Sequence, residues 1–502
     1  MNNILEIIGG IMTQQKTKKK SIFKNIGFYF AFIYLALTIL FIVQLFVLNM
    51  VPMKYMLPVI IVLVLLAIGL SYLQLGKRLS KLNRILGRII IVLLSLFLSV
   101  GNWYIFKTYH TFGELTDSDK DVSVVSVVVM KDSGYETIDD IAGGVVATTN
   151  LGDNKVLNEA IADLKKDVNV KLQDYNSMEA YGDALYNGEV TAMLLNEGMR
   201  GSFDEKHPQF DQDTKVLKSY TYETKAADIS KNVDVTEDPF NIYISGIDTY
   251  GTISTVARSD VNMLVTVNPT TKQILMTSIP RDYYVAQPCQ DNQKDKLTHS
   301  GIFGVSCTIE TAENFLNVPI NYYARVNFSS LVEMVDALGG INVYSPNTFV
   351  TMHGNYQIVE GENYMDGEKA LGFVRERYAF TSGDRERGRN QMRVVEAMIN
   401  KAISPAIITR YTSIMDAIAG SFQTNMSQSE INSLIRMQLD DMSGWEIFQY
   451  SVDGTGQGST WSPSYGFYAY MMVPDQATVD KANSLINTVL NDGRLVQENI
   501  GY

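Results

Sequence analysis

Three long apolar runs dominate the hydrophobic pattern of the first hundred residues. They cover residues 26–48, 57–75 and 89–106 and contain no charged side chain. Each is close to the ~20 residues that an α-helix needs to cross ~30 Å of hydrocarbon. No small-residue cleavage site follows the first run, which argues against a cleaved signal peptide. We therefore predict three transmembrane helices within residues 1–107.

The basic residues around these runs predict how the protein lies in the membrane. Lysines cluster ahead of the first run and basic residues recur at 76–88, whereas Lys54 is the only charge between the first and second runs. Because cytoplasmic loops carry the excess of Lys and Arg, we expect the N-terminus and the 76–88 loop in the cytoplasm. The chain from Thr108 onward is then expected outside the cell, in a multi-pass protein of the cell membrane.

The net charge differs between the two parts of the chain. The whole chain carries −12, but residues 1–107 hold twelve basic residues and one acidic residue, so the remainder is strongly acidic. An acidic body argues against nucleic-acid binding, which depends on a basic surface. DNA binding by the basic tail is an alternative, although its roughly twenty-five residues contain no helix-turn-helix pattern. The letters GGIM at 9–12 leave a translation start at Met12 open.

Short apolar strands alternate with amphipathic helices between residues 108 and 225, which indicates a small α/β accessory domain. Strands are expected near 122–130, 143–149, 168–175 and 190–198, and helices at 154–166 and 177–188. A polar linker follows at 226–239. The pattern does not reveal what this domain binds.

Residues 240–502 predict a second α/β domain, with a mixed central sheet covered by helices on its faces. Strands are expected at 240–248, at 261–282 as a pair about the turn 268–273, and at 320–328, 341–345 and 372–378. Helices are expected near 308–317, 329–340 and 384–403, with further helices and one strand pair around 445–454 after residue 410.

Six arginines lie between Phe373 and Arg393, in a chain whose net charge is negative. On the expected strand, the alternation of side chains places Phe373, Arg375 and Arg377 on one face. Buried guanidinium groups need an anionic partner, so an anion between these arginines is the simplest interpretation. Six solvated arginines are the alternative.

The expected helix that follows divides the other arginines into two stripes. Arg387 and Gln391 are four residues apart and continue into an apolar stripe, so they are expected to face the same site. Arg389 and Arg393 belong to the opposite stripe and are expected in solvent. The position of Arg385 is undecided.

Carboxylates and further arginines stand at the ends of the expected strands, where α/β proteins place ligands. Asp248 follows the first strand, Arg258 and Asp260 precede the second, and Arg281 and Asp282 follow the third. Carboxylates beside arginines suit a Mg²⁺ ion shared with a phosphate whose other oxygens the arginines bind. For each Asp taken alone, an ion pair or a turn is the better interpretation. The combination predicts a metal-assisted phosphate site.

The two cysteines, Cys289 and Cys307, flank a polar loop in the expected outer part. A disulfide between them would stabilise the fold by about 3 kcal/mol in the chain-entropy model. Two free thiols remain an alternative. A zinc site is disfavoured, because two thiols without CxxC or paired-His spacing make a poor ligand set.

The chain resembles the LytR-CpsA-Psr family through an ordered series of motifs: GIDTYG, RSDVNMLV, SIPRD, DKLTHSGIFG, ARVNFSSLVEMVDALGGINV and FVRERYAFTSGDRERGRNQ. The match covers about residues 238–405 and is best with capsule-associated streptococcal-type members that carry an accessory domain. The resemblance implies a Gram-positive phosphotransferase that depends on Mg²⁺, with Mn²⁺ as an alternative ion. It also implies a polyprenyl-pyrophosphate-linked glycan as substrate, with the lipid in an apolar tunnel.

The resemblance further implies roles for single residues and for partners. Asp248 and Asp260 match metal-holding carboxylates, and Arg281 and Asp260 are the expected catalytic residues. The expected pyrophosphate-binding set comprises Arg258, Arg281, Arg375, Arg377, Arg387 and Gln391. The implied partners are peptidoglycan, the membrane, and capsule polymerisation or tyrosine-kinase regulatory proteins.

These expectations describe a ligase that moves capsular polysaccharide from its lipid carrier to peptidoglycan. A lipid pyrophosphatase with water as acceptor, a membrane-bound regulator of capsule gene expression and a non-enzymatic scaffold are the alternatives. The sequence identifies neither the glycan nor whether the new bond is glycosidic or phosphodiester.

Overall fold

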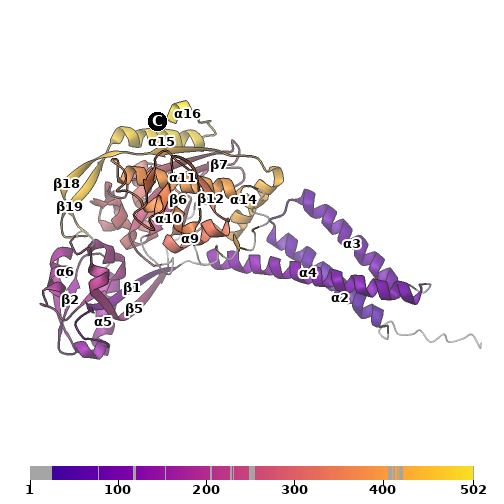
Figure 1. Ribbon diagram of the computed structural model, residues 1–502, viewed down its shortest axis with the longest axis horizontal. Coiled ribbons are helices and arrows are strands. Elements are labelled where there is room, and N and C mark those ends of the chain that lie inside the picture. Colours follow the sequence, from indigo (N-terminus) through magenta and orange to yellow (C-terminus); the bar gives the residue numbers. More distant parts are fainter. Residues whose placement is uncertain are drawn as a thin grey trace, which may run out of the picture. The chain divides into compact units, whose positions relative to one another are not determined.

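A computed structural model describes residues 25–76, 79–116, 120–152, 154–203, 206–225, 229, 231–247, 255–404, 410, 413–414, 417 and 422–500. The chain divides into two compact units, Met1–Tyr109 and His110–Tyr502 (Figure 1). The first unit is helical, and the second contains two α/β parts.

The first unit is built from three helices, α2 (Ile26–Leu48), α3 (Met53–Leu75) and α4 (Lys81–Thr116). Each is long and apolar enough to cross a membrane, which confirms the three predicted spans as helices. The helices pack together around Tyr34 and Leu98, while other apolar side chains such as Phe97 remain exposed. An apolar outer surface suits a lipid environment. The orientation in the membrane stays a prediction.

The second unit begins with a five-stranded sheet in the order β3-β2-β4-β1-β5. Its elements are β1 (Lys120–Met130), β2 (Val145–Thr149), α5 (Asn154–Asp167), β3 (Lys171–Tyr175), α6 (Met178–Tyr186), β4 (Ala192–Asn196), the 3-10 helix η3 (Glu197–Phe203) and β5 (Thr214–Lys225). The predicted strands and helices are confirmed. β5, which pairs with β1, was not predicted, because polar residues are typical of edge strands and hide the strand signal.

A six-stranded mixed sheet in the order β16-β11-β6-β7-β8-β17 forms the centre of the remaining part. Its strands are β6 (Phe240–Ile247), β7 (Ser259–Asn268), β8 (Gln273–Ile279), β11 (Tyr322–Val326), β16 (Phe422–Thr424) and β17 (Glu446–Ser451). β7 is antiparallel to both neighbours, whereas β11 is parallel to β6 and β17 is parallel to β8. The predicted turn between β7 and β8 is confirmed: the Asn268 side chain accepts hydrogen bonds from the N–H groups of Thr270 and Thr271.

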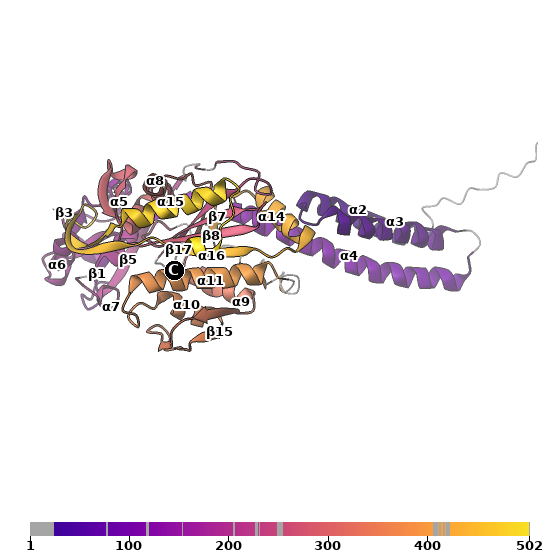
Figure 2. The ribbon, with the colours of Figure 1, turned by 90° about the horizontal axis from the view of Figure 1, so that it is seen from above.

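Helices cover both faces of this sheet (Figure 2). They are α8 (Val305–Leu316), α9 (Phe328–Ala337), α10 (Gly367–Arg375), α11 (Asp384–Ala402), α14 (Gln428–Asp441) and α15 (Gln476–Leu490). Leu264 and Leu275 join the core with α8 and α15, whereas Met263 and Met276 join the core with α11 and α14. Adjacent residues of one strand thus enter different cores, as the period of two requires. The predicted α/β architecture is confirmed.

The predicted strand at 372–378 is wrong, because most of this segment belongs to α10. The Asp366 side chain caps that helix by accepting a hydrogen bond from the backbone N–H of Lys369, at 2.9 Å. Phe373 is buried on the helix, Arg375 ends it, and Arg377 lies two residues beyond its end. The three side chains therefore do not share a strand face.

The strand pair expected around 445–454 also differs from prediction. β17 pairs with β8 in the central sheet. A separate hairpin follows, formed by β18 (Gly454–Ser462) and β19 (Phe467–Pro474). β17 and β18 follow each other closely in the chain, so their sequences alone suggested a pair. Which strand each one pairs with is decided by tertiary packing.

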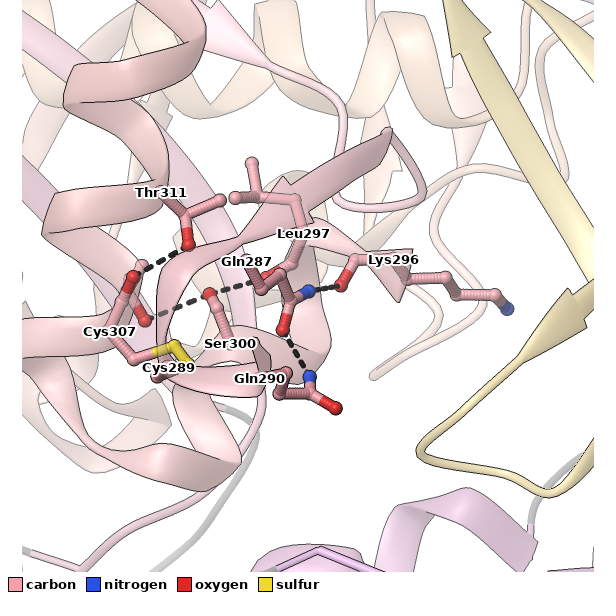
Figure 3. The surroundings of a disulfide bond; sticks show 9 residues. Gln287, Cys289, Gln290, Lys296, Leu297, Ser300, Cys307 and Thr311 are labelled. Atoms are coloured by element: carbon pink, nitrogen blue, oxygen red, sulfur yellow. Dashed lines mark hydrogen bonds between the residues drawn. A yellow bond between two sulfur atoms is a disulfide. The ribbon is translucent and has the colours of Figure 1, made fainter. Parts of the chain in front are cut away.

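A disulfide joins Cys289 to Cys307, with their Cα atoms 5.5 Å apart (Figure 3). The free-thiol alternative therefore does not describe the structure. The enclosed loop is also held by a hydrogen bond of 2.7 Å from the side-chain amide of Gln287 to the carbonyl oxygen of Lys296 (Figure 3).

Candidate active site

A cavity of about 890 Å³ opens beside β6, β7, α9, α10 and α11, within the usual size range of ligand sites. Every described residue of the predicted site lines it: Arg258, Asp260, Arg281, Arg375, Arg377, Arg387 and Gln391. Asp248, the second predicted metal ligand, lies outside the described residues. The structure thus brings together arginines that are separated by more than a hundred positions in the sequence.

Asp260 and Arg281 form an ion pair where β7 begins and β8 ends. Because β7 and β8 are antiparallel, the start of β7, at Asp260, lies beside the end of β8, just before Arg281. Arg281 Nη1 donates to Asp260 Oδ2 at 2.7 Å, and Thr298 Oγ1 donates to Asp260 Oδ1 at 2.8 Å. The carboxylate therefore fixes one guanidinium at the cavity wall.

The arginines around Asp260 control its charge. Burial alone would raise the pKa of Asp260, but the positive charges of Arg281, Arg258 and Arg387 together hold it below its ordinary value. Asp260 in turn raises the pKa of Arg281, whereas burial, as the largest cause, lowers the pKa of Arg387. The cavity therefore holds an ionised carboxylate among more numerous buried cations, an arrangement typical of functional sites.

Aromatic rings contact the next two arginines, and a buried carboxylate shapes the turn between them. The guanidinium of Arg375 lies over the ring of Phe328, 4.3 Å from its centroid, and that of Arg377 lies over Tyr378 at 4.7 Å. Between the two arginines, Glu376 is buried and accepts hydrogen bonds from the backbone N–H groups of Tyr378, Ala379 and Met352. The chain turn at Glu376 thus allows both guanidinium groups to line the cavity.

The arginines of α11 divide as the helical period predicts. Arg387 and Gln391 line the main cavity. Arg389 and Arg393 do not line it, and they donate to the buried Glu386 at 2.9 and 2.7 Å. These two arginines are therefore only partly in solvent, because a carboxylate on their own helix binds them.

Arg385, whose position was undecided, takes no place among the lining residues of the main cavity. Its Nε lies 2.6 Å from Asp453 Oδ1, and its Nη2 donates to the carbonyl oxygen of Gly454 at 2.6 Å. Arg385 therefore ties α11 to the start of the β18–β19 hairpin.

Much of the remaining cavity lining is apolar. Ile244, Ile247, Val261, Leu331, Val394 and Val395 contribute from β6, β7, α9 and α11. An apolar wall next to several guanidinium groups suits a ligand that carries both a hydrocarbon chain and an anionic group.

A profile of the LytR_cpsA_psr family matches residues 208–483, more than half of the chain. The chain belongs to the LytR-CpsA-Psr family. The match extends beyond the 238–405 segment in which the motifs were recognised, and it includes the β18–β19 hairpin.

Several relatives are polyisoprenyl-teichoic acid–peptidoglycan teichoic acid transferases named TagU. The protein of that name from Enterococcus faecalis is 36% identical over 241 residues, which cover 47% of this chain and 77% of the relative. That from Bacillus cereus is 30% identical over 306 residues, covering 61% and 93%. A crystal structure of TagV from B. subtilis is 27% identical, with a TM-score of 0.44 over 52% of this chain and 99% of TagV.

Of the two carboxylates predicted to hold the Mg²⁺ expected of a LytR-CpsA-Psr protein, Asp260 lines the described cavity. Both oxygens of Asp260 accept a hydrogen bond, and each keeps a further lone pair. The described residues contain no cluster of three His, Cys, Asp or Glu side chains. Mg²⁺ often uses only one or two carboxylates beside water and phosphate oxygens, so Asp260 fits an ion that is held largely by its substrate.

The sequence reasoning missed several residues of this LytR-CpsA-Psr site. Lys296 and Tyr465 line the cavity, with Lys296 Nζ 5.3 Å from the centroid of the Tyr465 ring and 3.5 Å from Asp282 Oδ1. Lys296 stands in the quoted DKLTHSGIFG motif, so its charge was visible there. Tyr465 lies between β18 and β19, 74 positions after Gln391, where the last motif ends, and had no local signal.

A second, smaller cavity of about 190 Å³ adjoins the first. It shares the side chains of Asp260, Arg281, Asp384, Arg387 and Gln391 with the main cavity. Its other lining residues include hydroxyl and charged groups: Ser278, Arg385, Arg389, Tyr450, Ser451, Asp453 and Thr478. The same arginines can therefore be approached from two cavities of different chemistry.

Proposed function

We propose that this protein is a membrane-anchored transferase that moves a capsular polysaccharide from a polyprenyl-pyrophosphate carrier to peptidoglycan. One observation carries the proposal: five arginines and Asp260 gather in a single cavity whose remaining wall is largely apolar. A guanidinium group can bind a phosphate through two parallel hydrogen bonds, and an apolar wall suits a polyprenyl chain. The names of the TagU relatives, which join a polyisoprenyl-linked polymer to peptidoglycan, support the same class of reaction.

The charge in the cavity suggests how the transfer is assisted. An acceptor hydroxyl oxygen forms a new bond to the sugar carbon or to the glycan's phosphorus while that atom's bond to the carrier breaks. The departing lipid phosphate keeps the electron pair and takes up the proton that the hydroxyl releases. Arg281, held by Asp260, and Arg387 offset the negative charge that develops on that phosphate. The same assistance serves cleavage of a sugar–phosphate bond, which makes a glycosidic link, and of a phosphate–phosphate bond, which makes a phosphodiester.

Mg²⁺, or Mn²⁺, is the proposed cofactor. Asp260, together with Asp248 outside the described residues, would hold the ion, which would supply further positive charge at the leaving phosphate. This assignment is supported by the ionised state of Asp260, whose pKa its arginine neighbours hold below the ordinary value after burial has raised it.

The second cavity is a suitable place for the acceptor. Transfer requires an acceptor hydroxyl and the carrier phosphate at the same arginines, and Arg281 and Arg387 line both cavities. Hydroxyl and carboxylate groups around the second cavity can exchange hydrogen bonds with sugar hydroxyls. A pyrophosphatase would place water there instead, and the two functions differ in whether the glycan becomes attached to the wall.

The decisive experiment measures polysaccharide covalently attached to peptidoglycan in a strain that lacks redundant relatives. Wild-type protein should restore attachment, and Arg281→Ala and Asp260→Ala should abolish it. Arg494→Ala is the matched control, because Arg494 forms an exposed ion pair with Glu446 away from the cavity.

The outcomes separate the alternatives. Normal attachment in both cavity variants would refute the catalytic role. Wild-type protein that hydrolyses the lipid carrier but attaches no glycan would identify a pyrophosphatase. Loss of teichoic acid rather than capsule from the wall would keep the transferase and replace its proposed polymer.

A further inference from the structure

The accessory domain contributes directly to the wall of the main cavity. Gly201, in its 3-10 helix η3, lines the cavity beside Arg258 of the other α/β part. The Gly201 carbonyl oxygen accepts a hydrogen bond of 2.7 Å from Arg258 Nη1. Arg258 is only 8% exposed, so this carbonyl is one of the groups that hold a buried guanidinium in place.

A side chain at position 201 would displace the guanidinium of Arg258. A Cβ atom placed on Gly201 would lie 2.2 Å from Arg258 Nη2 and 2.5 Å from its Cζ. Gly198 in the same 3-10 helix is constrained by backbone, since its Cβ would lie 2.8 Å from the carbonyl oxygen of Val256. Two glycines of η3 thus allow the backbone of the accessory domain to reach the segment that leads into β7.

Other contacts join the accessory domain to the same site. Met199 and Phe203 of η3 share a hydrophobic core with Tyr465 and Met471 of the β18–β19 hairpin. The backbone N–H of Met178 donates to the carbonyl oxygen of Tyr465 at 2.9 Å, and the ring of Tyr465 lines the cavity. The accessory domain therefore contacts two cavity residues that come from distant parts of the chain.

A buried ion pair adds to this interface. Arg325 on β11 is 2% exposed, and its Nη1 lies 3.1 Å from Asp121 Oδ1 at the start of β1. Breaking a buried pair by removing one partner is costly. The position of η3 beside Arg258 is thus supported by further contacts between the two α/β parts.

We infer that the accessory domain is a positioning part of the active site, because the Gly201 carbonyl holds Arg258 where its guanidinium binds the pyrophosphate. The inference rests on the proposed function, since it assigns Arg258 to phosphate binding. It gives the accessory domain a role that its own fold did not reveal: any displacement of η3 changes the affinity of the cavity for its anionic ligand.

A double-mutant cycle tests this role in the full-length protein in detergent, with geranylgeranyl pyrophosphate as the probe. The four proteins are wild type, Gly201→Ala, Arg258→Ala and the double variant. We expect Gly201→Ala to weaken binding of the probe about tenfold, the effect of one displaced charge-assisted hydrogen bond. In the Arg258→Ala background the same change should have no further effect, because the group it displaces is gone.

Ser202→Ala is the matched control in η3. The Ser202 hydroxyl is buried, and among the described residues it has no hydrogen-bond partner. This variant should bind the probe as the wild type does, and thermal unfolding should show that all variants are folded.

The results overturn the inference in two distinguishable ways. Equal weakening by Gly201→Ala in both backgrounds, or no weakening in either, would show that Gly201 does not act through Arg258. A wild-type protein that does not bind the probe would refute the proposed function, and the inference would fall with it.

Discussion

Arg387 and Arg393 lie six residues apart on α11 and have different surroundings. Arg387 lines the main cavity, whereas Arg393 donates to Glu386 and Asn390 at 2.7 and 2.6 Å. We expect Arg387→Ala to weaken binding of geranylgeranyl pyrophosphate by about tenfold or more, because it removes a buried cation from the anion site. Titration of the probe into each purified protein measures this effect.

Arg393→Ala serves as the matched variant and should behave in the opposite way. It leaves Glu386, which is 8% exposed, with one partner fewer and should lower the free energy of unfolding by about 1–3 kcal/mol. Probe binding should be unchanged, and urea unfolding measures the loss. Weaker binding by Arg393→Ala than by Arg387→Ala would contradict the division of the helix into two stripes.

The lowered pKa of Asp260 predicts how the free energy of unfolding depends on pH in the acid range. Its pKa in the folded protein is lowered, because the charges of Arg281, Arg258 and Arg387 outweigh the effect of burial. A lowered pKa adds stability above the unfolded value of about 3.9, and that stability is lost as the pH falls through the folded pKa. Arg281→Met removes the largest favourable charge, so it should raise the folded pKa and move the loss of stability to higher pH.

Urea unfolding between about pH 3 and about pH 7 measures this shift. The control is Asp260→Asn, which has no titrating carboxylate at position 260. In that background Arg281→Met should leave the pH dependence of the unfolding free energy unchanged. A shift of the same size with and without Asp260 would assign the effect to another group.

At the scale of elements, the disulfide between Cys289 and Cys307 secures the loop that carries Thr298 to Asp260. The two cysteines are 18 positions apart, so the chain-entropy model predicts about 3 kcal/mol of stabilisation. We expect the double variant Cys289→Ser/Cys307→Ser to lose about this much free energy of unfolding. Urea unfolding with and without reductant measures it.

The double variant also provides the control for the reductant. Reductant should destabilise the wild type and leave the variant, which has no thiols, unaffected. Equal stability of oxidised and reduced wild type would show that the loop is held by its other contacts, such as the bond from Gln287 to Lys296.

α10 shows why one element was predicted wrongly. The segment from Phe373 to Tyr378 reads FVRERY, which contains the strand-favouring residues Phe, Val and Tyr and neither glycine nor proline. The start of α10 is determined further upstream, where the Asp366 side chain accepts a hydrogen bond from the backbone N–H of Lys369. The N-cap signal of Asp366 was present in the sequence, and with it the helix could have been predicted.

At the scale of the whole molecule, the three helices at the start of the chain predict its topology. If the N-terminus is cytoplasmic, the segment around Lys54 lies outside the cell and that around Ser80 lies inside. Because the chain's own cysteines are joined, a single added cysteine reports its own location. In intact cells a membrane-impermeant maleimide should label Lys54→Cys and should label Ser80→Cys only after permeabilisation. The reverse pattern would invert the topology.

The accessory domain and the central α/β part also depend on each other at this scale. They share a hydrophobic core that includes Phe203 and Tyr465. The boundary between them was predicted as a polar linker at 226–239, yet their contacts are made elsewhere, through η3, β1 and the β18–β19 hairpin. A linker pattern shows where the chain crosses between domains and carries no information about how closely they pack.

Patterns within the chain were enough to predict the membrane helices, most strands and helices, and that Arg387 of α11 faces the cavity. These features depend on periodicity and charge over a few neighbouring residues, so they can be read locally. Folding alone brought Asp260 to Arg281, and the Gly201 carbonyl to Arg258. Such contacts join residues that are far apart in sequence, and their geometry follows from the packing of whole elements, which no local pattern encodes.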